Sequence, residues 1–264
     1  MTTLIRIELL KLHTTRVTYG LLATSTGLTV LYSLLAAARA STKAVKAAPV
    51  APLSTASGLG TVTTTTSFAL LFAAVLGVIV TSGEFRHGTA TLTYLGFPNR
   101  NRVLAAKFAA AAGVGAILGL VAGVVATVMG LAFVAVKGDS VTLGKPTLVA
   151  HIVGAALGAA LMAAIGAGLG SLVRSQLGAV VGILLWAVVA ETIIGGLFKS
   201  ARPYLPYAAA TTLGGTKLGQ ALGFLRLAPG AGPLPFAATA ALVLGVAVVL
   251  SALAAGTTVR RDIT

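Results

Sequence analysis

Residues able to do acid–base, nucleophilic or metal chemistry are scarce in this sequence. Its 264 residues include five acids, three histidines and no cysteine. There is no HExxH zinc motif, and no two carboxylates have a spacing typical of a catalytic pair. The segment GGTKLGQ around Lys217 lacks the GxxxxGK[ST] order of a phosphate-binding loop. We therefore expect no enzyme activity, no metal site and no cofactor in this chain, so any energy from ATP would come from another subunit.

Glu191 is the one acid within a long apolar run, WAVVAETIIGG. An ionisable residue at membrane depth is costly and is by default a functional candidate. A helix that starts near Leu177 would place Glu191 about 21 Å along its axis. There it could pair with Lys199 or Arg202, contact transported cargo, or bond to helix ends as a structural acceptor.

Residues 82–102, SGEFRHGTATLTYLGFPNRNR, form a polar stretch between two apolar runs. Glu84 favours a helix start, and Pro98 stops a helix within a residue or two. Apolar anchors are offered by Phe85, Leu92, Leu95 and Phe97. Charge on the water side would come from Arg86, Arg100, Arg102 and Lys107. The stretch is either a plain interfacial loop or a short surface helix that acts as a lever on the two adjoining spans.

The positions of these residues depend on long apolar helices. The chain is 57% hydrophobic and 9% charged, against about 25% charged for a soluble domain. Its apolar residues form blocks near the roughly 20 residues needed to cross a bilayer. We predict an all-α polytopic membrane protein with six transmembrane helices, at about Val17–Ala38, Thr61–Thr81, Phe108–Val134, Thr147–Leu172, Leu177–Phe198 and Pro235–Thr257.

The prediction makes residues 1–264 a single transmembrane domain. Residues 1–16 would be an interfacial leader helix, or else a short cytosolic leader. Residues 82–104 would be a loop, and residues 199–233, which contain four prolines, would form an outer loop with half-helices. Six spans place both termini on one side. Basic residues number ten on that side and nine on the other, so the positive-inside rule does not set the orientation.

The net charge of +14 does not indicate nucleic-acid binding, because the basic residues stand singly or in small groups between the spans. Such residues anchor membrane proteins to lipid headgroups.

Glycines recur at four-residue spacing within the predicted spans. Gly115, Gly119 and Gly123 form one ladder, and Gly154/Gly158, Gly166/Gly170 and Gly178/Gly182 repeat the spacing. Small residues let helix backbones approach closely in a bilayer. We interpret these ladders as ordinary helix packing, with a dedicated dimer seam as the alternative.

The polar stretch resembles the cytosolic loop of type-2 ATP-binding cassette (ABC) export permeases. That family reads approximately E-x-R-x-G-T, then P-x-R and A-K, and this chain has GEFRHGT at 83–89, then Pro98, Arg100 and Ala106-Lys107. Asn99 and Asn101 stand where the family often carries basic or small residues. Similar features elsewhere are E-L-x-K-L at 8–12, Trp186 with Glu191, Y-L-P at 204–206 and R-R-D at 260–262.

The resemblance implies that the stretch is a coupling helix that docks on an ATPase subunit. The residues it assigns to coupling are Glu84, Phe85, Arg86, Gly88, Thr89, Thr93, Pro98 and Arg100. It places Trp186 and Glu191 at the translocation pathway or a dimer interface. It also implies cytosolic termini in a bacterial inner membrane, a second identical or homologous permease unit, and partner ATPases that bind ATP and Mg.

The function expected from these features is that of a permease subunit of an ATP-driven exporter. The apolar, acid-poor spans suggest an amphipathic cargo such as a drug, an antibiotic or a lipid. One alternative is a proton-coupled secondary carrier that uses Glu191. Another is a membrane partner subunit that transports nothing.

Overall fold

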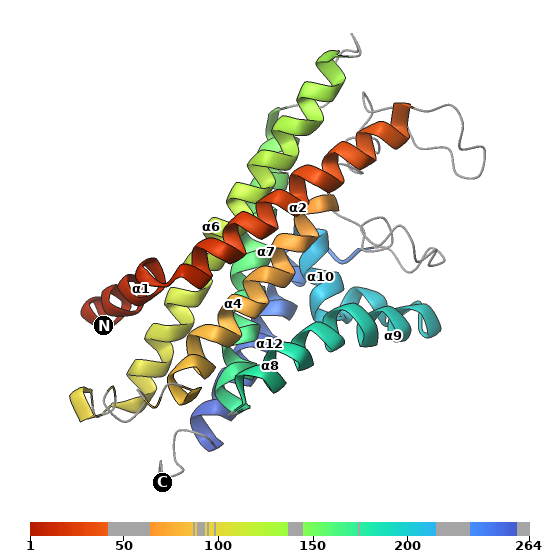
Figure 1. The fold of residues 1–264 in the computed structure, drawn as a ribbon. Coiled ribbons are helices and arrows are strands. Elements are labelled where there is room, and N and C mark those ends of the chain that lie inside the picture. Colours follow the sequence, from red (N-terminus) through yellow and green to blue (C-terminus); the bar gives the residue numbers. More distant parts are fainter. Residues whose placement is uncertain are drawn as a thin grey trace.

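The computed structural model is helical throughout the residues it describes, which are 1–41, 64–86, 88, 93, 95–97, 99–136, 145–173, 175–214 and 233–257. The longer helices are α1 (Thr2–Thr14), α2 (Arg16–Ser41), α4 (Ser67–Arg86), α6 (Arg100–Val136), α7 (Lys145–Leu172), α8 (Gln176–Leu184), α9 (Glu191–Leu197), α10 (Pro206–Leu213) and α12 (Phe236–Thr257). Short helical turns are η1 (Thr64–Thr66), η2 (Leu185–Ala190) and η3 (Arg202–Tyr204). Figure 1 shows the helices as an elongated bundle.

Five helical segments in the described part are long and apolar enough to cross a membrane. They are Ser67–Glu84, Arg100–Val136, Leu148–Leu172, Gln176–Leu197 and Phe236–Gly256. The chain is therefore a polytopic helical membrane protein, and five of the six predicted spans have a counterpart among these segments. The segment at Arg100–Val136 starts eight residues before the predicted span, so Lys107 lies within a helix.

Helix α2, at the position of the first predicted span, is not among the five, and hydroxyl groups interrupt its apolar surface. Its 26 residues reach about 39 Å. Ser25, Thr29 and Ser33 follow one another at four-residue spacing and are buried. The Thr29 hydroxyl donates to the Ser25 carbonyl oxygen, and the Ser33 hydroxyl lies 3.2 Å from that of Thr65. These hydroxyls give α2 a polar stripe that faces the protein.

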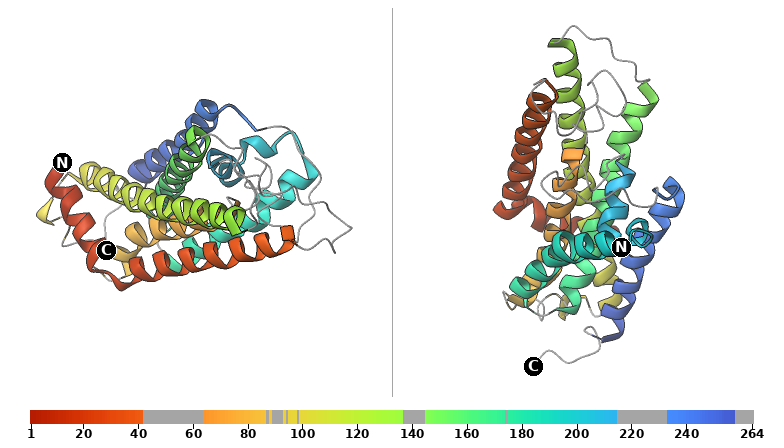
Figure 2. Two further views of the ribbon diagram at one scale, coloured as in Figure 1. Left: turned by 90° about the horizontal axis from the view of Figure 1, so that it is seen from above. Right: turned by 90° about the vertical axis from the view of Figure 1, so that its right-hand side faces the viewer.

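Helix α7 is the centre of the bundle and packs against α4, α6, α10 and α12 (Figures 1 and 2). Glycines stand at its contacts with all four neighbours. A Cβ atom added to α7 would contact α4 at Gly166, α10 at Gly154 and α12 at Gly168. On α6, a Cβ atom added at Gly115 or Gly119 would contact α7. Ordinary helix packing is thus confirmed for the ladders of α6 and α7, but not for the Gly178/Gly182 pair of α8. Gly182 has open space around it and takes no part in this packing.

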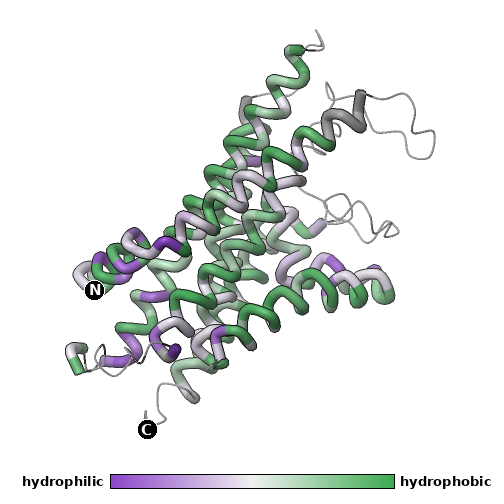
Figure 3. The backbone as a smooth tube through the Cα atoms, viewed as in Figure 1, coloured by the Kyte–Doolittle hydropathy of each residue, from purple (hydrophilic) through white to green (hydrophobic). Residues whose placement is uncertain are grey.

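One end of the bundle carries most of the polar residues. Helix α1, the last turn of α4, the first turns of α6 and the end of α12 all lie there, at the lower left of Figure 1. Figure 3 shows hydrophilic residues at this end and along α1, whereas the middle of the bundle is hydrophobic. The described residues of the polar stretch at 82–102 belong to this end.

The predicted outer half-helices are represented by α10, and residues 215–232 lie outside the described residues. Eight residues of α10 reach only about 12 Å. The helix packs against α7 and α12, and most of its side chains are buried. It is a short buried helix in the wall of the bundle.

Exchange of one packing glycine should separate two helices. In Gly166→Ala, the added Cβ would overlap the Ala74 carbonyl oxygen of α4. We expect a loss of about 1–3 kcal/mol in stability, as for other overpacked sites. Gly182→Ala is the matched control, because its Cβ meets nothing and helix propensity alone should add about 0.5–1 kcal/mol. Unfolding in mild detergent measures both, and equal effects of the two variants would contradict this packing.

Candidate functional site

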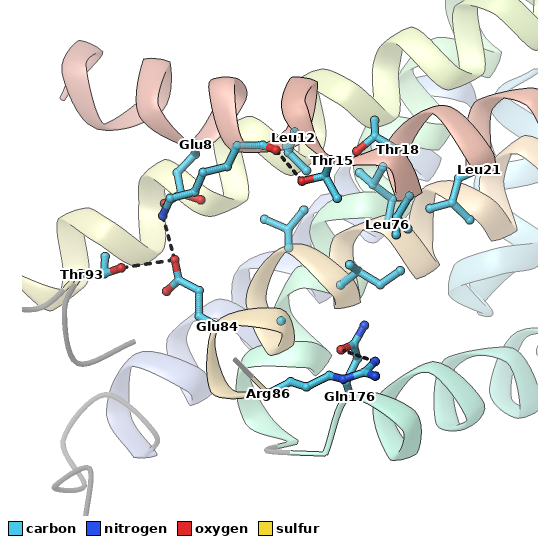
Figure 4. A pocket seen from close by; sticks show the side chains of 15 residues that line it. Glu8, Leu12, Thr15, Thr18, Leu21, Leu76, Glu84, Arg86, Thr93 and Gln176 are labelled. Atoms are coloured by element: carbon cyan, nitrogen blue, oxygen red, sulfur yellow. Dashed lines mark hydrogen bonds and ion pairs between the residues drawn. The ribbon is translucent and has the colours of Figure 1, made fainter. Parts of the chain in front are cut away.

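Four charged side chains meet where α1, α4 and α6 come together. Glu8 and Lys11 come from α1, Glu84 from the last turns of α4 and Lys107 from the third turn of α6. We call these four residues the charge cluster. Figure 4 shows Glu8 of α1 above Glu84 of α4, with Thr93 beside Glu84. The cluster therefore joins segments that are 23 to 99 residues apart in the chain.

Lys107 is at the centre of the charge cluster. Its Nζ atom lies 3.0 Å from each carboxylate oxygen of Glu8 and 2.6 Å from Oε1 of Glu84. Lys11 Nζ lies 3.0 Å from Glu8 Oε1 and 2.9 Å from Glu84 Oε1. The Thr93 hydroxyl also donates to Glu84 Oε1, at 3.4 Å. Each carboxylate thus bridges two ammonium groups.

The charge cluster is shielded from solvent on its inner side. The side chains of Lys107, Glu8 and Glu84 are 4%, 5% and 11% exposed, whereas that of Lys11 is 45% exposed. The charges of the two carboxylates and the two ammonium groups cancel, which makes burial of the charge cluster tolerable. Burial lowers the pKa of Lys11, but its hydrogen bonds and charge attraction to Glu84 and Glu8 outweigh burial and leave this pKa raised above 10.5.

The buried face of α1 explains how Glu8 reaches Lys107. Leu4, Glu8 and Leu12 follow at four-residue spacing and all face the bundle. Leu4 packs with Val103 and Ala106 of α6, which aligns the two helices. Glu8, which disturbs the amphipathic pattern of the leader, is thus a buried partner of Lys107. The prediction that Lys107 supplies charge on the water side is wrong, because its side chain is almost fully buried.

The described residues of the polar stretch lie next to the charge cluster. Gly88 has a φ of 65°, a left-handed conformation that glycine adopts readily. Phe97 N donates to the Thr93 carbonyl oxygen at 3.0 Å, which is one turn of helix. Phe97 packs beside Leu4, as an anchor should. Leu95, another predicted anchor, is 76% exposed instead.

The remaining predicted coupling residues lie around this turn. Phe85 is in the last turn of α4, and Arg100 is the first residue of α6. Asn99 caps α6, because its Oδ1 accepts from Arg102 N at 3.2 Å. The resemblance to the permease loop did not suggest this role for Asn99. Arg86 is exposed, and its guanidinium donates to Gln176 Oε1 of α8 at 3.4 Å. Thr89 and Pro98 lie outside the described residues.

Glu191 lies in a separate site, at the junction of α9 and α10. Its Oε1 accepts from Tyr207 N at 2.8 Å and from Trp186 Nε1 at 3.1 Å, and its Oε2 accepts from Ala208 N at 2.8 Å. Tyr207 and Ala208 are in the first turn of α10, where backbone N–H groups lack partners within the helix. Glu191 is only 1% exposed. Of the three interpretations of this acid, the structure supports the acceptor that holds a helix end.

The π-helical turn η2 brings Trp186 and Glu191 to the same side. The Glu191 N–H donates to the Trp186 carbonyl oxygen, a bond across five residues. In a wider turn of this kind, residues five apart lie on the same side of the helix, whereas in an α-helix they point in different directions. Although its indole N–H is bonded to Glu191, Trp186 is 48% exposed. Pro206 is the first residue of α10. Because proline has no backbone N–H, it adds no unpaired donor at the start of this helix.

The described residues include no group of three His, Asp or Glu side chains that could hold a metal ion. No model of a known protein family matches the chain, and a search of curated protein sequences also found no match.

Removing the central ammonium of the charge cluster should destabilise the protein strongly. Lys107→Met leaves two buried carboxylates without their main partner, which costs about 3–5 kcal/mol at comparable sites. Lys11→Met is the matched control, because exposed ion pairs are worth about 0–1 kcal/mol. Unfolding in detergent measures both variants. A Lys107→Met protein as stable as Lys11→Met would mean that the charge cluster does not hold α1, α4 and α6 together.

Loss of the Glu191 carboxylate should loosen α10. Glu191→Gln replaces one acceptor oxygen by an amide that faces a backbone N–H, with an expected cost of about 1–3 kcal/mol. Trp186 is the only tryptophan, so its fluorescence follows both this site and unfolding. Glu191→Asp, which keeps the charge on a shorter side chain, is the control. Unchanged stability and emission in Glu191→Gln would contradict a role in holding the start of α10.

Proposed function

We propose that the chain is the membrane-spanning permease subunit of an ATP-driven exporter, and that residues 84–102 dock on a separate ATPase subunit. The observation that carries the proposal is the charge cluster. It binds the end of α4 and the start of α6, the two helices that flank this segment, to each other and to α1. A push on residues 84–102 would then be passed to two long membrane helices at once.

The resemblance to type-2 ABC export permeases gains support from the positions of its motif residues. The leader motif contributes Glu8 and Lys11, the loop motif contributes Glu84, and the A-K pair contributes Lys107. These three motifs meet in the charge cluster, although they are far apart in the sequence. A second pair of features, Trp186 with Glu191 and the Y-L-P run, meets at the start of α10.

In this proposal α2 is the first of six spans, and the charge-cluster end faces the cytosol of a bacterial cell. Support for α2 comes from its length and from its packing against α4 and α6, with its buried hydroxyl stripe toward the protein. A partner permease unit would cover part of the apolar surface of α8, η2 and α9, where Leu177, Leu185, Trp186 and Ile193 are exposed. The cargo would be an amphipathic molecule.

The bonding of Glu191 favours this proposal over a proton-coupled carrier. A proton carrier needs a carboxylate that can gain and lose its proton during the cycle. Three fixed donors converge on Glu191, two of them backbone N–H groups of α10. Protonation would break contacts that hold a buried helix in place.

The proposal predicts that the chain engages an ATPase through the charge-cluster end. We expect the chain to co-purify with a P-loop ATPase from its own cells and to stimulate ATP hydrolysis. Arg86→Glu should reduce that stimulation at least tenfold, because like charges at an interface suppress association. Lys199→Glu, an exposed reversal in the segment after α9, is the control and should have no effect. Transport of an amphipathic dye by the isolated chain in liposomes, without ATPase or ATP, would refute the proposal.

A further inference from the structure

A pocket of about 650 Å³ lies beside the charge cluster. It is bounded by the elbow between α1 and α2, the second half of α4 and the start of α8 (Figure 4). The elbow bends at Thr15, whose backbone is extended between the two helices. The His13 and Tyr19 rings pack edge to face across it, with centroids 5.9 Å apart. The volume falls within the range of roughly 300–1,000 Å³ that is usual for small-molecule sites.

The pocket changes from charged to apolar along α4. Its polar end has Lys11, Arg86 and Gln176, and its apolar end has Leu21, Leu76 and Val80. Leu76 precedes Glu84 by eight residues of α4, which is about 12 Å along the helix axis. The polar end is therefore at the polar end of the bundle, and the apolar end points toward its hydrophobic middle (Figure 3). Such a gradient fits a ligand with a polar head and an apolar chain.

The polar end of the pocket, taken together with the adjoining Lys107, has one positive charge in excess. The four residues of the charge cluster cancel, and among the described residues the bond of Arg86 is to the neutral Gln176 amide, at 3.4 Å. In the described part of the chain, no carboxylate lies within ion-pair distance of Arg86. The described carboxylates, Glu8, Glu84 and Glu191, are all bonded to donors of this chain. The head that suits this end is an anion.

The walls of the pocket point to the membrane as the source of the ligand. Helices α2 and α8 both pack on α4 but do not pack extensively on each other. Their outward side chains beside the pocket are apolar and exposed, with Val17 at 46%, Leu177 at 75% and Val181 at 44%. In a bilayer these surfaces face acyl chains. A lipid could therefore enter sideways, with its head at the level of the polar residues.

We propose that this pocket binds one anionic phospholipid of the adjacent leaflet. The phosphate lies at Arg86 and Lys11, and an acyl chain lies along Leu76 and Val80. This site goes beyond the proposed transport function and does not depend on it, because the isolated chain contains every residue involved. The bound lipid would join α1, α4 and α8 at the level where the charge cluster joins α1, α4 and α6.

Gly83 offers a way to fill the pocket without disturbing the fold. It lines the pocket, and a Cβ at this position would meet nothing within 4 Å. Gly83→Leu would therefore place a side chain in the space assigned to the lipid. Gly113→Leu is the matched control, because Gly113 also has open space around it and does not line the pocket. Arg86→Gln removes the proposed anion partner, and Arg102→Gln removes an exposed arginine outside the pocket.

The test is native mass spectrometry of the purified chain with added phosphatidylglycerol, phosphatidylcholine or glycerol phosphate. We expect one phosphatidylglycerol to bind more tightly than phosphatidylcholine, and glycerol phosphate not to bind. Arg86→Gln should lower the preference for phosphatidylglycerol roughly fivefold to tenfold, the effect of one cation at an anionic headgroup. Gly83→Leu should abolish binding of this lipid. Gly113→Leu and Arg102→Gln should bind as the unaltered chain does.

Three results would overturn the proposal. Equal binding of the two phospholipids would mean that no anion is recognised. Binding of glycerol phosphate as tight as that of phosphatidylglycerol would mean a site for a soluble anion. A dimer that binds no lipid and that Gly83→Leu converts to a monomer would mean that a second copy of the chain fills the pocket. None of these results depends on an ATPase, so the proposed transport function is tested separately.

Discussion

A buried ammonium group between two carboxylates governs the polar end of this protein. Lys107 of α6 contacts Glu8 of α1 and Glu84 of α4 at 2.6 to 3.0 Å, and its side chain is 4% exposed. A charge so buried is tolerable only with partners in good geometry. The three helices therefore have little freedom to move independently at this end. The position of α1, the direction in which α4 ends and the start of α6 all follow from that requirement.

The middle of the bundle depends on a different constraint, which is close backbone contact. Lipid offers no hydrophobic drive for helices to associate, so packing must supply it. Helix α7 meets four neighbours through glycine and alanine, and a single Cβ at Gly166 or Gly154 would overlap a carbonyl oxygen of the next helix. The helices at the centre are thus closely packed, with no room for a side chain at these contacts.

The three carboxylates in the described part of the chain are bonded within the two polar sites, whereas several arginines are exposed to the surroundings. Glu191 holds the start of α10, and Glu8 and Glu84 hold α1 and α6. Arg6, Arg16, Arg86 and Arg102 are exposed near the same end of the bundle. An anionic headgroup in the pocket and an ATPase subunit at residues 84–102 would both involve Arg86. The two proposals therefore describe overlapping parts of one positively charged end.

The sequence by itself determined the class of the protein, because long blocks of apolar residues leave few alternatives to membrane helices. It also located the polar stretch at residues 82–102 and singled out Glu191. It did not decide the roles of these acids, because a single acid in an apolar run has the same sequence signature whether it binds cargo or caps a helix. Only the tertiary structure paired Glu8 with Lys107, since their 99-residue separation carries no local signal. For the same reason only the structure revealed the pocket, whose walls come from four helices.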